Sequence, residues 1–117
     1  MNDSNNFSSS TTPREWAFFH MRMGQWERSI DEVLHSANPQ DIKDVARGVF
    51  DIAYDHHYYD FAYFACRLAQ DPAIYQKMER AQLNGFKAHI EKIDQAFSQG
   101  LVAVRAYYQV MLKRMHE

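Results

Sequence analysis

The chain has three prolines, and each directly follows a residue that commonly caps the start of a helix. These pairs are Thr12-Pro13, Asn38-Pro39 and Asp71-Pro72. Proline is favoured at the first helical position, because the backbone N–H that it lacks would have no intrahelical partner there. Glu15 adds a capping-box pattern to the first pair. The sequence therefore predicts three helix starts, and Gly100 predicts the end of one helix before another begins at Leu101.

Apolar side chains between these positions recur every three or four residues, which is the spacing of one helix face. The expected helical segments span about residues 13–33, 39–70, 72–98 and 101–116. Over 39–70 we favour one helix, and a break near Asp55 is the alternative. The predicted fold is all-α, a four- or five-helix bundle-like domain over residues 13–117. Residues 1–12 are mostly Asn, Ser and Thr, and this composition predicts a disordered tail.

Six apolar residues of the first segment form a stripe with the spacing of coiled-coil a and d positions. The stripe consists of Trp16, Phe19, Met23, Trp26, Ile30 and Val33. A stripe of this kind is covered most simply by the same helix of a second copy. We therefore expect a homodimer in which these six residues form the dimer seam.

Aromatic side chains make up 15% of the chain, which is more than one small helical core requires. If residues 49–70 form one helix, Phe50, Tyr54, Tyr58 and Phe61 lie along one side. His56, Tyr59 and Tyr63 lie along the opposite side. Tyrosine tolerates both water and burial, as interface residues must. We therefore predict a partner-binding surface that includes Phe18, Met21, His56, Tyr59, Tyr63, Tyr107 and Val110. The alternative is that these residues only widen the core face of each helix.

Charge and hydropathy argue against two classes of partner. Thirteen basic and fifteen acidic side chains give a net charge of −2, which disfavours sequence-independent binding to nucleic acid or to anionic membranes. The longest uninterrupted apolar run, residues 61–66, is far shorter than the ~20 residues that span a bilayer. The N-terminal residues lack a basic segment followed by an apolar one, so we expect a cytoplasmic protein without a membrane or nucleic-acid partner.

No residue pattern indicates catalysis, a metal or a cofactor. Cys66 is flanked by apolar residues and is expected to be a small buried hydrophobe, because no base or thiolate-stabilising charge is evident beside it. Glu32 and His35 form one Glu-x-x-His pair, whereas a di-iron bundle needs two. The acidic and histidine cluster of the second segment is expected to be a solvated face: Asp51, Asp55, His56, His57 and Asp60. We expect a non-enzymatic protein without catalytic residues, metal or cofactor.

Two family resemblances give alternative functions. Residues 64–72, continuing to residues 97–101, resemble the middle of the ligand-binding half of TetR-type repressors, in which a helix, an Asp-Pro step and a long helix ending in Gln-Gly are common. We expect a protein without the DNA-binding half of those repressors. This resemblance implies a small-molecule sensor or carrier. The aromatic residues themselves suggest where such a ligand would bind, in a pocket inside the bundle lined by Tyr54, Tyr58 and Phe61.

The short all-helical chain, the seam and the spare aromatic faces together resemble the small helical anti-activators of bacterial quorum sensing. That resemblance implies a homodimer that binds a LuxR-type transcription factor. It also implies a steric mechanism, in which a helical surface covers the dimerisation face of the receptor and so prevents DNA binding. We take this non-enzymatic inhibition of a partner protein as the leading functional hypothesis.

Overall fold

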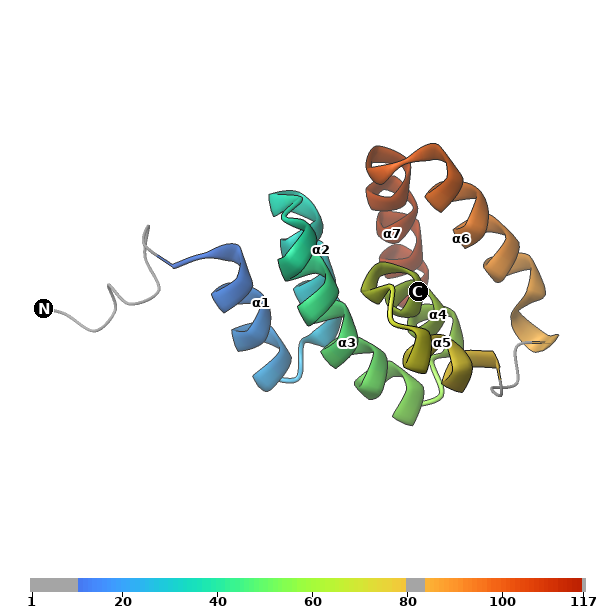
Figure 1. The fold of residues 1–117 in the computed structure, drawn as a ribbon, viewed down its shortest axis with the longest axis horizontal. Helices are drawn as coiled ribbons and strands as arrows, with labels where there is room; N and C mark the ends of the chain where they lie inside the picture. The colour runs from blue at the N-terminus through green and yellow to red at the C-terminus, as the bar shows by residue number, and fades with distance from the viewer. Residues whose placement is uncertain (1–10, 80–83, 117) are drawn as a thin grey trace, which may run out of the picture.

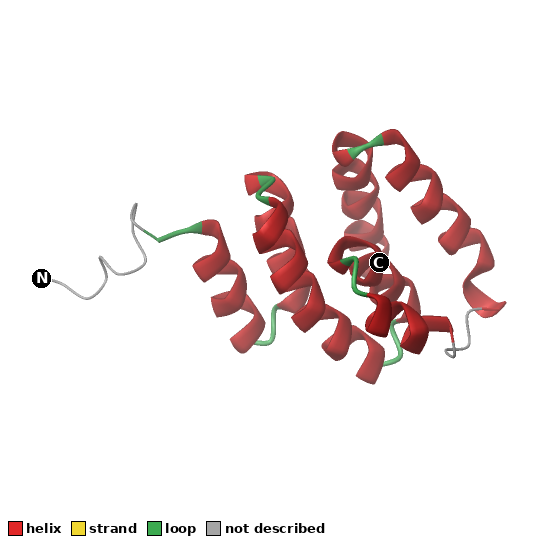
Figure 2. Ribbon diagram, in the orientation of Figure 1, coloured by secondary structure: helices red, strands yellow, loops and turns green. Residues whose placement is uncertain are grey.

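A computed structural model of the chain describes residues 11–79 and 84–116 (Figure 1). In these residues the chain forms α-helices and one 3-10 turn joined by short loops, without a strand (Figure 2). The helices are α1 (Pro13–Arg22), α2 (Trp26–Ser36), α3 (Pro39–Asp55), α4 (Tyr59–Ala69), α5 (Pro72–Glu79), α6 (Lys87–Gln99) and α7 (Leu101–Met115). The predicted all-α class is confirmed. Residues 1–10 of the predicted tail lie outside the described residues.

All three predicted Pro-marked helix starts are confirmed. At the start of α1, the Thr12 backbone N–H donates to Glu15 Oε1 at 2.9 Å, and the Glu15 N–H donates to Thr12 Oγ1 at 3.1 Å. The bond from the Thr12 backbone lowers the pKa of the Glu15 carboxyl. Asn38 Oδ1 accepts from the third residue of α3 at 3.0 Å, and Asp71 Oδ1 accepts from the second residue of α5 at 3.0 Å. These starts depend on contacts within three residues, which explains why the sequence predicts them.

The prediction of one helix over residues 13–33 is wrong. Helix α1 ends at Arg22, and α2 begins at Trp26. Gly24 lies between them with a φ of +81°, a conformation that disfavours residues with a Cβ atom. The turn folds α2 back onto α1, where the Ser29 hydroxyl donates to the carbonyl oxygen of Ala17 at 2.6 Å. The stripe spacing is helical on each side of the turn, so periodicity alone did not reveal the break.

One continuous helix over residues 39–70 is also wrong, and the alternative break near Asp55 is confirmed. His57, just after α3, has a φ of +66°, and the Tyr58 N–H donates to the carbonyl oxygen of Ala53 at 2.9 Å. This backbone reversal lets α4 pack antiparallel along α3 (Figure 1). Tertiary packing therefore outweighs the continuous helical periodicity of this segment.

The predicted helix over residues 72–98 is divided as well. Helix α5 ends at Glu79, a 3-10 turn spans Asn84–Phe86, and α6 begins at Lys87. Residues 80–83, which the prediction also included, lie outside the described residues. Each of three long predicted helices is thus replaced by two shorter ones, which is why the described chain exceeds the four or five helices expected.

A chain of ring contacts runs through the core from α2 to α6. The ring centroids of Trp26 and Phe61 are 5.5 Å apart, those of Phe61 and Tyr108 are 6.0 Å apart, and those of Phe64 and Tyr108 are 5.0 Å apart. Phe64 also contacts Phe97 of α6, with centroids 5.4 Å apart. Figure 1 places α1 and α6 at opposite ends of the molecule, with the core between them. Many of the aromatic residues that seemed to be a surplus therefore connect four helices.

Candidate partner-binding site

The six residues of the predicted dimer seam do not form one stripe. Trp26, Ile30 and Val33 of α2 are buried in the core of the chain. Trp16 and Phe19 are half-buried on α1, and Met23 beyond its end is 63% exposed. The seam as a single helical surface is wrong, because the turn at Gly24 separates its two halves and folding covers the second half. Dimerisation itself stays a prediction.

Four predicted partner residues lie in two separate places. On α1, Phe18 is half-buried with the Arg14 guanidinium 5.2 Å from its ring centroid, and half-buried Met21 packs beside Gly48 of α3. At the turn between α3 and α4, His56 is exposed, and Tyr59 is half-buried with its ring 5.6 Å from that of Tyr54. These two places are on different elements, and neither one joins the other candidates into a common surface.

Tyr63 belongs to the core, which contradicts its predicted place on an exposed face. Its side chain is 9% exposed, and its hydroxyl donates to Asp94 Oδ1 of α6 at 2.6 Å. Arg67, one turn further along α4, forms an ion pair with the same carboxylate oxygen. Burial raises the pKa of the Tyr63 hydroxyl well above its usual range, and the hydrogen bond to Asp94 adds a smaller rise in the same direction. The residue therefore joins α4 to α6.

The remaining two candidates, Tyr107 and Val110 of α7, lie together in a surface groove between α6 and α7. The groove has a volume of about 520 Å³ and is lined by Lys92, Gln95, Ala96, Gln99, Ala103, Ala106, Tyr107 and Val110. On each helix the four lining residues have the spacing i, i+3, i+4 and i+7, so each helix offers one continuous face. Val110 is 45% exposed at the groove wall.

Small side chains give the groove its depth. Ala96 of α6 is buried, Ala103 is half-buried, and Ala106 is exposed, so a side chain from outside can approach both helix backbones closely. The sequence does not single out these alanines, because larger side chains define the apolar faces expected over residues 72–98 and 101–116. Their spacing on both sides of the Gly100 turn was the signal that could have found the groove.

The groove wall contains a buried tyrosine hydroxyl. The Tyr107 hydroxyl oxygen is buried and has no hydrogen-bond partner among the described residues. A buried polar group left without a hydrogen bond costs about 1–3 kcal/mol. The Tyr107 hydroxyl therefore disfavours folding, whereas the hydroxyl of the adjacent Tyr108 donates a hydrogen bond of 2.6 Å to the Glu27 carbonyl oxygen.

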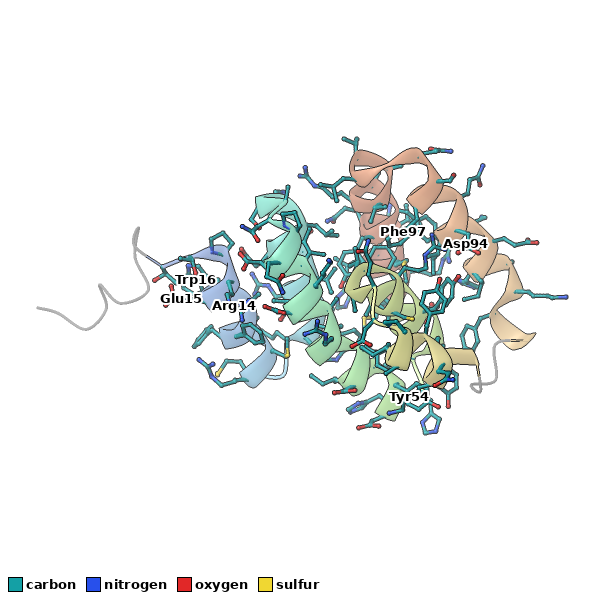
Figure 3. All side chains as sticks on the ribbon, in the orientation of Figure 1. Arg14, Glu15, Trp16, Tyr54, Asp94 and Phe97 are labelled. Atoms are coloured by element: carbon teal, nitrogen blue, oxygen red, sulfur yellow. The ribbon has the colours of Figure 1, made fainter. Side chains whose placement is uncertain are left out.

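A second hollow lies where α4, α5 and α6 meet. Its volume is about 630 Å³, and its lining consists of Arg67, Gln70, Pro72, Tyr75, Gln76 and Phe97. The Arg67 guanidinium carbon lies 4.9 Å from the centroid of the Phe97 ring. Figure 3 shows Asp94 and Phe97 together on α6, with Tyr54 far from both. The predicted pocket residues Tyr54, Tyr58 and Phe61 are therefore not part of this hollow.

Cys66 is fully buried in α4, as expected from its apolar neighbours. Burial raises the pKa of its thiol to about 11, so the nucleophilic thiolate is disfavoured at neutral pH. In the described ranges, no three His, Cys, Asp or Glu side chains are grouped so that they could hold a metal ion. Across the same ranges, no helix combines the length and hydropathy needed to cross a membrane.

Comparison with protein-family profiles, with curated proteins and with solved structures finds no match for this chain.

Proposed function

We propose that this chain is a non-enzymatic regulatory protein that binds and inhibits a partner protein. The observation that carries the proposal is the α6–α7 groove, which has a floor of small residues, an exposed apolar wall at Val110 and the unpaired hydroxyl of Tyr107. The lining side chains of α6 and of α7 form two rows at helical spacing. This arrangement favours a third helix as the occupant of the groove, because its side chains can interdigitate with both rows.

The proposed partner is a LuxR-type transcription factor in the cytoplasm, as the resemblance to quorum-sensing anti-activators implies. A helix of the receptor that normally supports its dimerisation would occupy the groove, so the receptor could not assemble on DNA. Homodimerisation of the inhibitor is part of this proposal.

The test is inhibition of DNA binding by a purified LuxR-type receptor from the native host. We expect the wild-type chain to release the receptor from promoter DNA in a gel-shift assay. Ala106→Trp should abolish the effect, because a large ring at this exposed position fills the groove. Ala73→Trp is the matched control, since Ala73 is an exposed alanine of α5 outside the groove. Unchanged DNA binding with the wild-type chain would contradict the proposed inhibition.

A small-molecule sensor or carrier is the second candidate function, and the hollow beside Arg67 favours it. Its volume of about 630 Å³ is in the usual range for ligand pockets, and it combines aromatic walls with polar side chains. Native mass spectrometry of protein purified from its own host should detect a bound ligand that Tyr75→Ala loses. A spectrum with the bare chain mass alone would argue against this second function.

A further inference from the structure

The charge of this molecule is divided unevenly along the chain. Residues 11–79 contain eleven acidic and seven basic side chains. In contrast, the described residues from Lys87 to Met115 contain two acidic and five basic ones. The net charge of −2 therefore conceals a basic α6–α7 hairpin, which is the same hairpin that forms the groove.

Two of the basic side chains, Lys92 and Arg114, lie at the end of the groove away from the Gly100 turn. A hollow of about 190 Å³ adjoins the groove there, and it is lined by Ala88, His89, Lys92 and Arg114. Lys92 lines both the groove and this hollow. Arg114 Nη1 lies 2.9 Å from His89 Nδ1, which brings the end of α7 against the start of α6. Two exposed cations from different helices thus face one end of an apolar groove.

A second copy of this chain fits the groove poorly if it presents its own α7. Helix α7 contains Arg105, Lys113 and Arg114 and no acidic residue. Two such helices side by side would bring like charges together, and like charges across an interface disfavour association. Complementarity instead requires a helix with negative charge near Lys92 and Arg114 and an apolar stripe against the alanines.

On the basis of the proposed function, we propose that the groove binds an acidic amphipathic helix of another protein. The apolar stripe of that helix packs on Ala96, Ala103 and Ala106. Its Asp or Glu residues lie at one end only, beside Lys92 and Arg114. This arrangement fixes the direction in which the helix binds, because the Gln99 end of the groove offers amides rather than cations.

The proposal is tested with two fluorescent helical peptides, whose affinities for the chain are measured by fluorescence anisotropy. Both peptides have the same leucine stripe, but one has Glu residues at one end and the other has Lys residues there. The wild-type chain should bind the Glu peptide about tenfold more tightly at low salt, and added salt should reduce the difference. The double variant Lys92→Glu with Arg114→Glu should reverse the preference. Both residues are exposed, so circular dichroism should show an unchanged fold.

The variant Ala106→Trp distinguishes two outcomes: that the bound helix is not acidic, and that the groove does not bind a helix at all. If both peptides bind equally and Ala106→Trp abolishes this binding, the inference of an acidic helix is overturned. The proposed function is then unaffected. Binding that Ala106→Trp leaves intact, or no binding of either peptide, would exclude the groove as a helix site and overturn the inference. A dimer that Ala106→Trp converts to a monomer in light scattering would assign the groove to a second copy, which also overturns it.

Discussion

The Tyr108 hydroxyl of α7 donates a hydrogen bond of 2.6 Å to the backbone carbonyl oxygen of Glu27 in α2. The bond joins the last described helix to the second one across the core. Burial raises the pKa of the Tyr108 hydroxyl, which therefore stays protonated as a donor. The preceding residue, Tyr107, has a buried hydroxyl without a described partner. Of these two adjacent tyrosines, one therefore has a hydrogen-bonded hydroxyl, and the other has a buried hydroxyl without a described partner.

Tyr108→Phe should lower the free energy of unfolding by about 1–2 kcal/mol, because it leaves the Glu27 carbonyl without this donor. Tyr107→Phe is the matched control and should leave stability unchanged or slightly higher, because it removes an unpaired buried hydroxyl and keeps the ring. Urea denaturation monitored by circular dichroism measures both variants. A larger loss in Tyr107→Phe than in Tyr108→Phe would contradict the described hydrogen bonds.

Gly100→Ala should destabilise the α6–α7 hairpin by about 1–3 kcal/mol. Gly100 has φ +105° and ψ 179°, a conformation that residues with a Cβ atom rarely adopt. Space is not the reason, since an added Cβ would meet no atom within 4 Å. Thermal denaturation measures the effect. Gly48→Ala serves for comparison: it lies within helix α3, where an added Cβ would meet only the flexible side chain of Met21, so we expect a smaller change.

Stability should fall as the pH rises from about 9 to about 11, in part because of Cys66. Burial raises the pKa of this thiol from 9.0 to about 11. In that interval the unfolded thiol ionises while the folded one remains protonated, so ionisation favours the unfolded chain. The loss from this group reaches roughly 2–3 kcal/mol at the upper limit. Urea denaturation across the interval should show a smaller pH dependence for Cys66→Ala; equal dependence would exclude a contribution from the thiol.

Asp94→Asn should weaken the attachment of α6 to α4, because Tyr63 and Arg67 both bond to the same Asp94 oxygen. The carboxylate is half-exposed, so we expect a modest loss of about 1 kcal/mol of unfolding free energy. Hydrogen exchange should show the loss as faster exchange in α6. Asp51→Asn, at an exposed position of α3, is the control and should leave α6 unaffected.

Of the eight residues that line the α6–α7 groove, the sequence predicted only Tyr107 and Val110 as partner-binding residues. Helical periodicity places a residue on a face of its own helix, but it does not say what covers that face. Tyr63 lies one helical turn after Tyr59 on the same face of α4. Nevertheless, α6 covers Tyr63 and provides Asp94 as its hydrogen-bond partner. The groove itself depends on alanines whose small size becomes informative only when two helices are placed side by side.

The amino-acid sequence by itself determined the all-α class and the three helix starts at Pro13, Pro39 and Pro72. Capping and helical periodicity act over three or four residues, so the local sequence specifies them. Only the tertiary structure decided that residues 39–70 divide into two helices at His57, where no glycine marks the turn. A left-handed backbone conformation at the end of a helix is locally unfavourable for residues other than glycine. The packing of α4 on α3 compensates at His57, and this compensation is a property of the whole fold rather than of the segment.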